Sequence, residues 1–245
     1  MNDKFDDMKW RRKLYEKNNL NEGVYDQGIF KAVFTAGGPG SGKSFTASSL
    51  FGIPTTMPFV SADGLKGVNS DSTFEAYLKK AGLGADMEKM GPVDYAKAQE
   101  LRSTAKNVTA KRMATYINGK LGMLIDGTGK NFAKVEKKQK LLKSIGYDCY
   151  MVFVNTSLEV ALERNKKRDR VVPEDMVKKY WKEVQNNLGK FQSLFGRSNL
   201  LVVDNSTYEK FPDAVVSAAN AFVKKPIKNH VAQTWIKKEL EIRKK

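Results

Sequence analysis

The sequence predicts an α/β fold in which helices flank a parallel sheet. Five short apolar segments are typical of strands buried on both faces; they cover residues 29–35, 58–62, 121–125, 147–154 and 199–203. Helical patterns lie between them, at residues 43–50, 132–145, 158–168, 174–194 and 208–223. Strands that alternate with helices favour parallel pairing through right-handed crossovers.

The composition fits one α/β domain with elaborations, since the chain has 245 residues and is 41% hydrophobic. The formal net charge of +16 favours anionic partners such as nucleotides or nucleic acid, or reflects a lysine-rich solubilising surface. Cys149 and His230 are single, which excludes an intrachain disulfide and argues against a structural zinc site. Without a signal peptide or a membrane-length apolar run, a soluble cytoplasmic protein is expected.

Three segments depart from plain alternation. Residues 1–28 form a predicted N-terminal helical extension, and residues 29–223 carry the main domain. Within it, residues 64–120 are too long for a simple crossover and read as a helical insertion, with helices at 72–81 and 93–117. This insertion either covers the substrate side or only packs on the body. The basic tail, 224–245, is expected to form a docked or frayed terminal helix, with nucleic-acid contact as the alternative.

The stretch GGPGSGKSF, residues 37–45, fits the pattern G-x-x-x-x-G-K-[ST], with a strand before it and a helix after it. That geometry directs backbone N–H groups and a helix N-terminus at one phosphate-binding position. Lys43 would contact the β- and γ-phosphates, and the Ser44 hydroxyl would bind Mg²⁺. The residues expected to hold a nucleoside triphosphate, ATP or GTP, are Gly38, Pro39, Gly40, Ser41, Gly42, Lys43, Ser44 and Phe45.

Two aspartates follow predicted strands, where an open α/β sheet binds its ligands. Asp63, in FVSADGLK, would face the γ-phosphate and accept a proton from an attacking hydroxyl, while Lys66 would neutralise substrate charge. A turn or helix cap explains Asp63 equally well, because Asp-Gly is a common turn pair. Asp126, in MLIDGTGKN, has the Walker B pattern that holds Mg²⁺ directly or through water. Thr128 adds a hydroxyl beside it.

Three arginines in RNKKRDR, Arg164, Arg168 and Arg170, precede a Val-Pro pair at which the helix must have ended. Arg164 and Arg168 are four residues apart and would share a helix face. A lid carrying these arginines would stabilise charge on a transferring phosphoryl group and exclude water. The alternative is a solvated basic helix end. After the last strand, Asn205 would either contact adenine or end the strand in a simple turn.

Taken together, these motifs resemble the P-loop kinases of the zeta-toxin and polynucleotide-kinase group, particularly its phage-encoded members. The resemblance covers about residues 29–223 and rests on GGPGSGKS, Asp63 with Lys66, LIDGTGK, RNKKRDR before VP, and the late Asp-Asn pair. It implies a five-stranded parallel sheet in the order 2-3-1-4-5, ATP and Mg²⁺ as ligands, Asp63 as general base, lid arginines, Asn205 near adenine, and a host cytoplasm if phage-encoded. Lys66 stands where the group usually has arginine.

These observations predict a phosphotransferase that moves the γ-phosphate of ATP to a hydroxyl with the help of Mg²⁺. The acceptor would be a polynucleotide 5′-hydroxyl or a small metabolite such as a nucleotide-sugar. The alternative is a nucleotide-binding or ATP-hydrolysing protein with an assembly or nucleic-acid-binding role. The two differ in whether labelled phosphate from ATP reaches an acceptor or only water.

Overall fold

The computed structural model describes residues 24–52, 64–86, 89–168, 171–207 and 210–244. Most of the helical extension expected at 1–28 lies outside these ranges, as do the strand expected at 58–62, Asp63 and Arg170. Among the described residues, none of the helices combines the length and the apolar character that a membrane span requires.

The five-stranded sheet has the predicted order, β2-β3-β1-β4-β5, and each neighbouring pair of strands is parallel. Its strands are β1 (Lys31–Ala36), β2 (Lys66–Val68), β3 (Met123–Ile125), β4 (Asp148–Asn155) and β5 (Leu200–Asp204). The two central strands, β1 and β4, are almost entirely buried, as expected for a sheet covered on both faces. All carboxyl ends therefore meet along one edge of the sheet.

The second strand of this sheet is Lys66–Val68, within the segment from 64 to 120 that the sequence assigns to a helical insertion. Lys66 pairs with Met123 and Val68 with Ile125, so the strand adds to the free edge of β3. Lysine and glycine are poor strand formers, and three residues give no readable alternation. Pairing with β3, rather than local propensity, makes this segment a strand.

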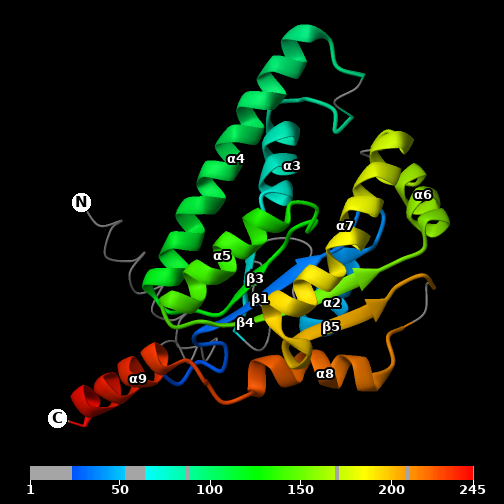
Figure 1. The fold of residues 1–245 in the computed structure, drawn as a ribbon. Helices are drawn as coiled ribbons and strands as arrows, with labels where there is room; N and C mark the ends of the chain where they lie inside the picture. The colour runs from blue at the N-terminus through cyan, green and yellow to red at the C-terminus, as the bar shows by residue number, and fades with distance from the viewer. Residues whose placement is uncertain (1–23, 53–63, 87–88, 169–170, 208–209, 245) are drawn as a thin grey trace, which may run out of the picture.

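Helices cover both faces of the sheet (Figure 1). Several start where expected: Asn131 caps α5 and Ser157 caps α6 through their side-chain oxygens, and Pro173 precedes α7. The helices are α2 (Lys43–Phe51), α3 (Asp71–Lys80), α4 (Pro92–Asn118), α5 (Phe132–Ser144), α6 (Leu158–Lys166), α7 (Glu174–Phe195), α8 (Asp213–Lys224) and α9 (His230–Arg243), with a 3-10 turn η2 (Arg197–Asn199).

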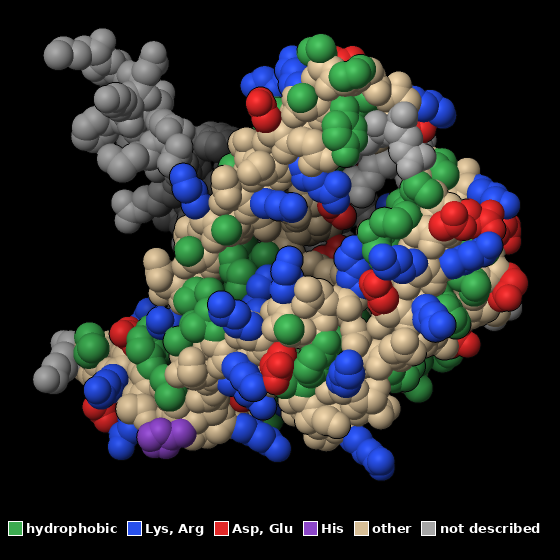
Figure 2. Space-filling model, turned by 45° about the horizontal axis from the view of Figure 1, so that its top comes forward, with side chains coloured by type: hydrophobic (Ala, Val, Ile, Leu, Met, Phe, Trp, Pro, Cys, Tyr) green, Lys and Arg blue, Asp and Glu red, His purple; other side chains and the backbone are tan. Residues whose placement is uncertain are grey.

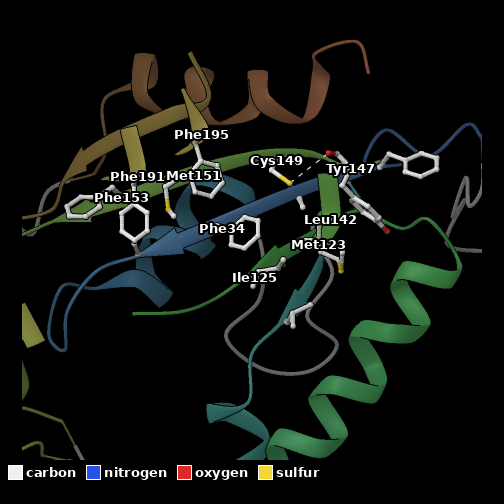
Figure 3. Packing of buried hydrophobic residues seen from close by; sticks show 14 of the residues in the cluster. Phe34, Met123, Ile125, Leu142, Tyr147, Cys149, Met151, Phe153, Phe191 and Phe195 are labelled. Carbon is white, nitrogen blue, oxygen red and sulfur yellow. Dashed lines mark hydrogen bonds between the residues drawn. The ribbon is translucent and has the colours of Figure 1, made fainter. Parts of the chain in front are cut away.

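Two hydrophobic clusters fill the space between the sheet and the helices. The first contains Phe34, Met151 and Phe153 of the sheet with Leu142 of α5 and Phe191 of α7 (Figure 3). The second lies on the opposite face, where Leu50 and Phe51 of α2 pack with Phe222 of α8. The resulting three layers fix the carboxyl edge of the sheet from both sides.

Two elements extend this core. Helices α3 and α4 form a hairpin with its own small cluster, Phe74, Leu78, Ala98 and Ala105, and it projects away from the sheet in Figure 1. Helix α9 docks on the body, because Ala232 is buried and Trp235 contacts Phe30 edge-on at 5.5 Å between ring centroids. The terminal helix is therefore packed, although Val231, which the sequence places near the same face, is 48% exposed.

Candidate functional site

The glycine-rich loop between β1 and α2 has the conformation of a phosphate cradle. Gly40 and Gly42 have φ values of 78° and 80°, a region that favours glycine. A Cβ at Gly40 would collide with the carbonyl of Ala161 in α6, and one at Gly42 with the amide of Asn205. Both glycines are therefore required by the backbone and by its neighbours. The loop delivers the chain to the N-terminus of α2, where free N–H groups attract anions.

The Lys43 ammonium lies over this loop and donates to the carbonyls of Gly37 at 2.8 Å and Gly38 at 3.3 Å. Burial is the largest effect on the Lys43 ammonium and lowers its pKa. The negative charges of Asp126 and Asp71 raise this pKa, and the positive charge of Arg168 lowers it further. One cation, in the position that contacts nucleotide phosphates, thus has two carboxylates and a guanidinium around it. A bound triphosphate would bring further negative charge to this ammonium.

Asp126 follows β3, as predicted, and its carboxylate is held by two neighbouring strands. Thr35 of β1 donates its hydroxyl to one oxygen at 2.7 Å, and Asn69, just after β2, donates its amide to the other at 2.8 Å. The Thr35 oxygen also accepts the Gly127 N–H at 3.3 Å. The carboxylate is therefore oriented before any ligand arrives, at the carboxyl edge beside the loop.

Asp71 is the residue at this edge that the sequence interpretation did not identify. It is exposed, begins α3 three residues after β2 ends, and its N–H donates to Asn69 Oδ1 at 2.7 Å. The same Asn69 side chain therefore connects Asp71 and Asp126. The available signal was VNSD, an apolar residue followed by polar ones at a strand end. This signal does not point to Asp71 when the preceding strand is expected at residues 58–62.

The two described lid arginines have different positions. Arg164 of α6 donates to the carbonyls of Asn205 at 2.6 Å and Thr207 at 3.0 Å, across the mouth of the loop. Helix α6 ends at Lys166, so the expectation that Arg168 shares its face with Arg164 is wrong. Arg168 instead lies in the turn beyond the helix, near enough to Lys43 to affect its pKa.

Asn205 is 2% exposed and supports the loop from behind. Its amide donates to the Ser41 carbonyl at 2.7 Å, and the Thr156 hydroxyl donates to the same carbonyl at 3.2 Å. The amide nitrogen is thus engaged with the loop backbone, so a positioning role accounts for this residue, and the predicted adenine contact remains untested. The Ser41 hydroxyl is buried without a hydrogen-bond partner, a polar group left over inside the cradle.

Two further predicted residues lie at opposite ends of the strands. Thr128 is at the carboxyl edge, and its carbonyl accepts the Gly37 N–H at 3.0 Å, which ties the β3–α5 loop to the glycine-rich loop. Lys66 is 5% exposed at the amino end of β2, level with Met123. This position does not support the predicted contact of Lys66 with substrate.

Phe45, the last residue expected to hold the nucleotide, is 48% exposed, and its ring centroid lies 5.6 Å from that of Phe211.

The donor set at the edge suits a hard divalent cation. The Ser44 hydroxyl and the Asp126 carboxylate are oxygen ligands, and each carboxylate oxygen has a lone pair beyond its one hydrogen bond. No three His, Cys, Asp or Glu side chains cluster within the described ranges. Mg²⁺ bound with a nucleotide needs no such cluster, because phosphate oxygens and water complete its shell. These residues therefore fit the ion.

Residues 33–190, from β1 through most of α7, match the model of one protein family, AAA_33, described as an AAA domain. The chain belongs to the AAA_33 family. The matched range contains the glycine-rich loop, Asn69, Asp71, Asp126 and both described arginines. No curated protein matches the chain.

Solved structures share the AAA_33 chain's fold at low sequence identity. The complex of AvrRxo1-ORF1 with AvrRxo1-ORF2, determined with ATP, has a TM-score of 0.54 and 14% identity; the match covers 80% of this chain and 64% of that one. A candidate kinase from Chloroflexus aurantiacus gives 0.49 and 15%, with coverages of 78% and 97%. The PezAT toxin–antitoxin system of Streptococcus pneumoniae gives 0.49 and 12%, with coverages of 92% and 98%. These likenesses concern the fold alone.

Proposed function

We propose that this protein is an ATP- and Mg²⁺-dependent phosphotransferase that moves the γ-phosphate to a substrate hydroxyl. One observation carries the proposal: Asp71 and Asp126, from the ends of neighbouring strands, are joined by Asn69 beside the Lys43 ammonium. A nucleotide sensor needs only the loop and one metal-binding carboxylate, whereas an enzyme that transfers the γ-phosphate also needs a group that positions or deprotonates the attacking nucleophile. A second carboxylate, exposed beside the phosphate site, is what a kinase needs to accept the proton of an incoming hydroxyl.

In this mechanism Asp71 is the general base. It is exposed at the start of α3, so a bound hydroxyl has access to its carboxylate, and its backbone is fixed by Asn69. Asp63, the base implied by the resemblance to the zeta-toxin and polynucleotide-kinase group, lies outside the described residues and is the second candidate. Only one of the two is required to take the proton.

The remaining groups balance charge. Lys43 and the loop N–H groups hold the β- and γ-phosphates, while Arg164 and Arg168 stabilise the transferring phosphoryl group. Arg170, which lies outside the described residues, is the third arginine proposed for this role. Ser44 and Asp126 would hold Mg²⁺, which neutralises phosphate charge and orients the phosphates when bound. Catalysis of this kind depends on positioning and electrostatics rather than on covalent chemistry.

The acceptor is a hydroxyl of a polynucleotide 5′ end or of a small metabolite such as a nucleotide-sugar. The α3–α4 hairpin begins at Asp71, so it is placed to contact whatever hydroxyl compound Asp71 activates. Incubation with γ-labelled ATP and a panel of acceptors tests the function: 5′-hydroxyl DNA and RNA, nucleosides, nucleotide-sugars and protein. Label found only in inorganic phosphate across the whole panel would reject the phosphotransferase.

The Asp71→Asn variant separates the two candidate bases. We expect it to lose transfer by about 10²-fold or more, because an amide cannot accept the proton, while ATP affinity stays within about twofold. Steady-state transfer kinetics and equilibrium ATP binding measure the two effects. Asp94→Asn, at an exposed aspartate in the first turn of α4, is the matched control and should behave as wild type. Full activity in Asp71→Asn, with activity lost in Asp63→Asn, would assign the base to Asp63.

A further inference from the structure

We propose that a hollow between the start of α5 and helix α7 binds single-stranded nucleic acid. The hollow has a volume of about 540 Å³, and its lining includes three lysines, two aromatic rings and one acid: Lys130, Lys179, Lys190, Phe132, Tyr180 and Glu183. We call it the α7 groove. None of these six residues has a role in the mechanism above.

The α7 groove adjoins the nucleotide site. Lys130 lies four residues after Asp126, and Asn187 of α7 donates its amide to the carbonyls of Gly129 and Lys130, both at 3.0 Å. On the other side, Trp181, the neighbour of Tyr180, packs its backbone against Gly38 of the glycine-rich loop. One end of the groove therefore lies near the carboxyl edge of the sheet, where Asp126 is held, and the groove continues from there along α7.

Two of the three lysines of the groove are paired with its rings. The Lys130 ammonium lies 3.4 Å from the centroid of the Tyr180 ring, and that of Lys190 lies 5.8 Å from the centroid of Phe132. Ammonium groups beside aromatic faces match a ligand that alternates phosphates with flat bases, since phosphates bind the cations and bases stack on rings. Glu183 offsets one of the three positive charges, so the groove keeps an excess of two.

The length of the groove favours a strand over a single nucleotide. Lys179 and Lys190 are eleven residues apart on one helix, which places their Cα atoms about 16 Å apart. Together with Glu183 and Asn187 they follow the three- and four-residue spacing of one helix face. One phosphate or diphosphate cannot contact both lysines, whereas several consecutive phosphates of a strand can. As an acceptor site, the α7 groove rests on the proposed phosphotransfer; as a binding site, it does not.

Lysine and arginine side chains are spread widely over the face shown in Figure 2, so a charge-matched control is essential. The test variant is Lys179→Ala with Lys190→Ala. The control is Lys178→Ala with Lys182→Ala, two exposed lysines of the same helix that do not line the groove. The full chain, saturated with ADP and Mg²⁺ to fill the nucleotide site, is titrated into a short fluorescent oligodeoxythymidine with a 5′-hydroxyl, and the anisotropy is recorded at several salt concentrations.

We expect the test variant to weaken oligonucleotide binding at least about fivefold and to reduce the salt slope by about 1.4, the value for two lost contacts with a single strand. ADP affinity should not change, and the control should stay within about twofold of wild type. Equal losses in both variants would mean diffuse attraction to a basic surface and would overturn the proposal. The proposal would also be overturned if a uridine diphosphate sugar or a mononucleotide bound as tightly as the oligonucleotide and lost as much affinity in the test variant.

Substitution of Tyr180 tests base stacking separately from charge, because the oligonucleotide affinity then changes without a change in net charge. Tyr180→Ala should weaken binding about fivefold or more, because it removes a stacking surface, and Tyr180→Phe should restore it. Unchanged binding in Tyr180→Ala would remove the base-stacking part of the proposal and contradict it. The two proposals also fail separately: groove-dependent binding, with label found only in inorganic phosphate across the whole acceptor panel, would leave the nucleic-acid site standing and reject phosphotransfer.

Discussion

The side chains around Asp126 show how single residues prepare the site. Thr35 and Asn69 each give one hydrogen bond to its carboxylate, and Asn69 also fixes the backbone of Asp71. Thr35 is 4% exposed and Asp126 is half-buried, so these bonds operate in a setting where charge-assisted hydrogen bonds are strong. The orientation of a metal-binding carboxylate therefore depends on two neutral residues that would never contact the metal.

Thr35→Val tests this dependence. The change keeps the shape of the side chain but leaves Asp126 with one donor and the Gly127 N–H without its acceptor. We expect transfer to need more Mg²⁺ for half-maximal rate and kcat/KM to fall about tenfold, near the lower end of the roughly 1.5–3 kcal/mol of a hydrogen bond to a charged group. A Mg²⁺ titration of the transfer rate measures it. Thr35→Ser, which keeps the hydroxyl, should restore the wild-type titration, and an unchanged titration in Thr35→Val would refute the role.

The sequence could predict Lys43, Ser44 and Asp126 because each stands in a short motif with a fixed place beside a strand. It could not predict the bridge made by Asn69, since the partners of an amide depend on which strands are neighbours. The expected contact of Lys66 with substrate also depends on which segment forms the strand. Once Lys66–Val68 becomes the strand, Lys66 is at its amino end and Asp71 replaces it near the edge.

At the scale of elements, α7 connects the two loops of the site. Its apolar face packs Val184 and Phe191 into the first core cluster. Its Trp181 indole donates to the carbonyl of Thr156 at 2.8 Å, and the Thr156 hydroxyl donates to the Ser41 carbonyl of the glycine-rich loop at 3.2 Å. Asn187 holds the carbonyls of Gly129 and Lys130. One helix thus braces the glycine-rich loop and the loop after Asp126 together, and a shift of α7 would move both.

Asn187→Ala should loosen that connection. The residue is 6% exposed, and its loss leaves two carbonyls without their donor, a cost of about 1–3 kcal/mol in the free energy of unfolding. Because the loop after Asp126 loses its anchor, kcat/KM for transfer should fall as well. Urea unfolding followed by circular dichroism and transfer kinetics measure the two effects. Asn186→Ala, at the exposed neighbouring residue, is the control and should change neither.

Most elements could be predicted from apolar patterns, because helices such as α5 and α7 are long and periodic, Asn131 caps α5, and the central strands are nearly continuous apolar runs. The edge strand β2 could not, since it is short and owes its conformation to β3. Helix α6 also ends at Lys166 rather than at Arg168, the end that the sequence predicts. The Asn165 side chain donates to the Val172 carbonyl and accepts from the Val172 N–H, which turns the chain back after the helix.

For the whole molecule, the two edges of the sheet have separate tasks. Among the described residues, the carboxyl edge carries those of the proposed site, including Lys43, Asp71 and Asp126. The amino edge is closed by α9, where Trp235 packs on Phe30 and the Asn229 amide donates to the Lys143 carbonyl at 2.7 Å. Stability and catalysis should therefore be separable by mutation.

Trp235→Ala should lower the free energy of unfolding by about 2–4 kcal/mol, since it removes a large, partly buried ring from the first core cluster. Below the melting range, kcat/KM for transfer should match wild type, because the residue is at the opposite edge from the site. Thermal unfolding and transfer rates provide the measurements. Thr234→Ala, exposed on the same helix, is the control, and a loss of transfer in folded Trp235→Ala would contradict the separation of the two edges.

The outer part of the α3–α4 hairpin has its own core of Phe74, Leu78, Ala98 and Ala105, while Met113, Tyr116 and Ile117 near the end of α4 pack on the first core cluster. Substitutions on its outer surface leave the packing of the three layers untouched. A chain built this way can evolve a new acceptor while its grip on the donor nucleotide stays the same. The hairpin is also the natural unit to exchange between relatives when a different acceptor is wanted on this scaffold.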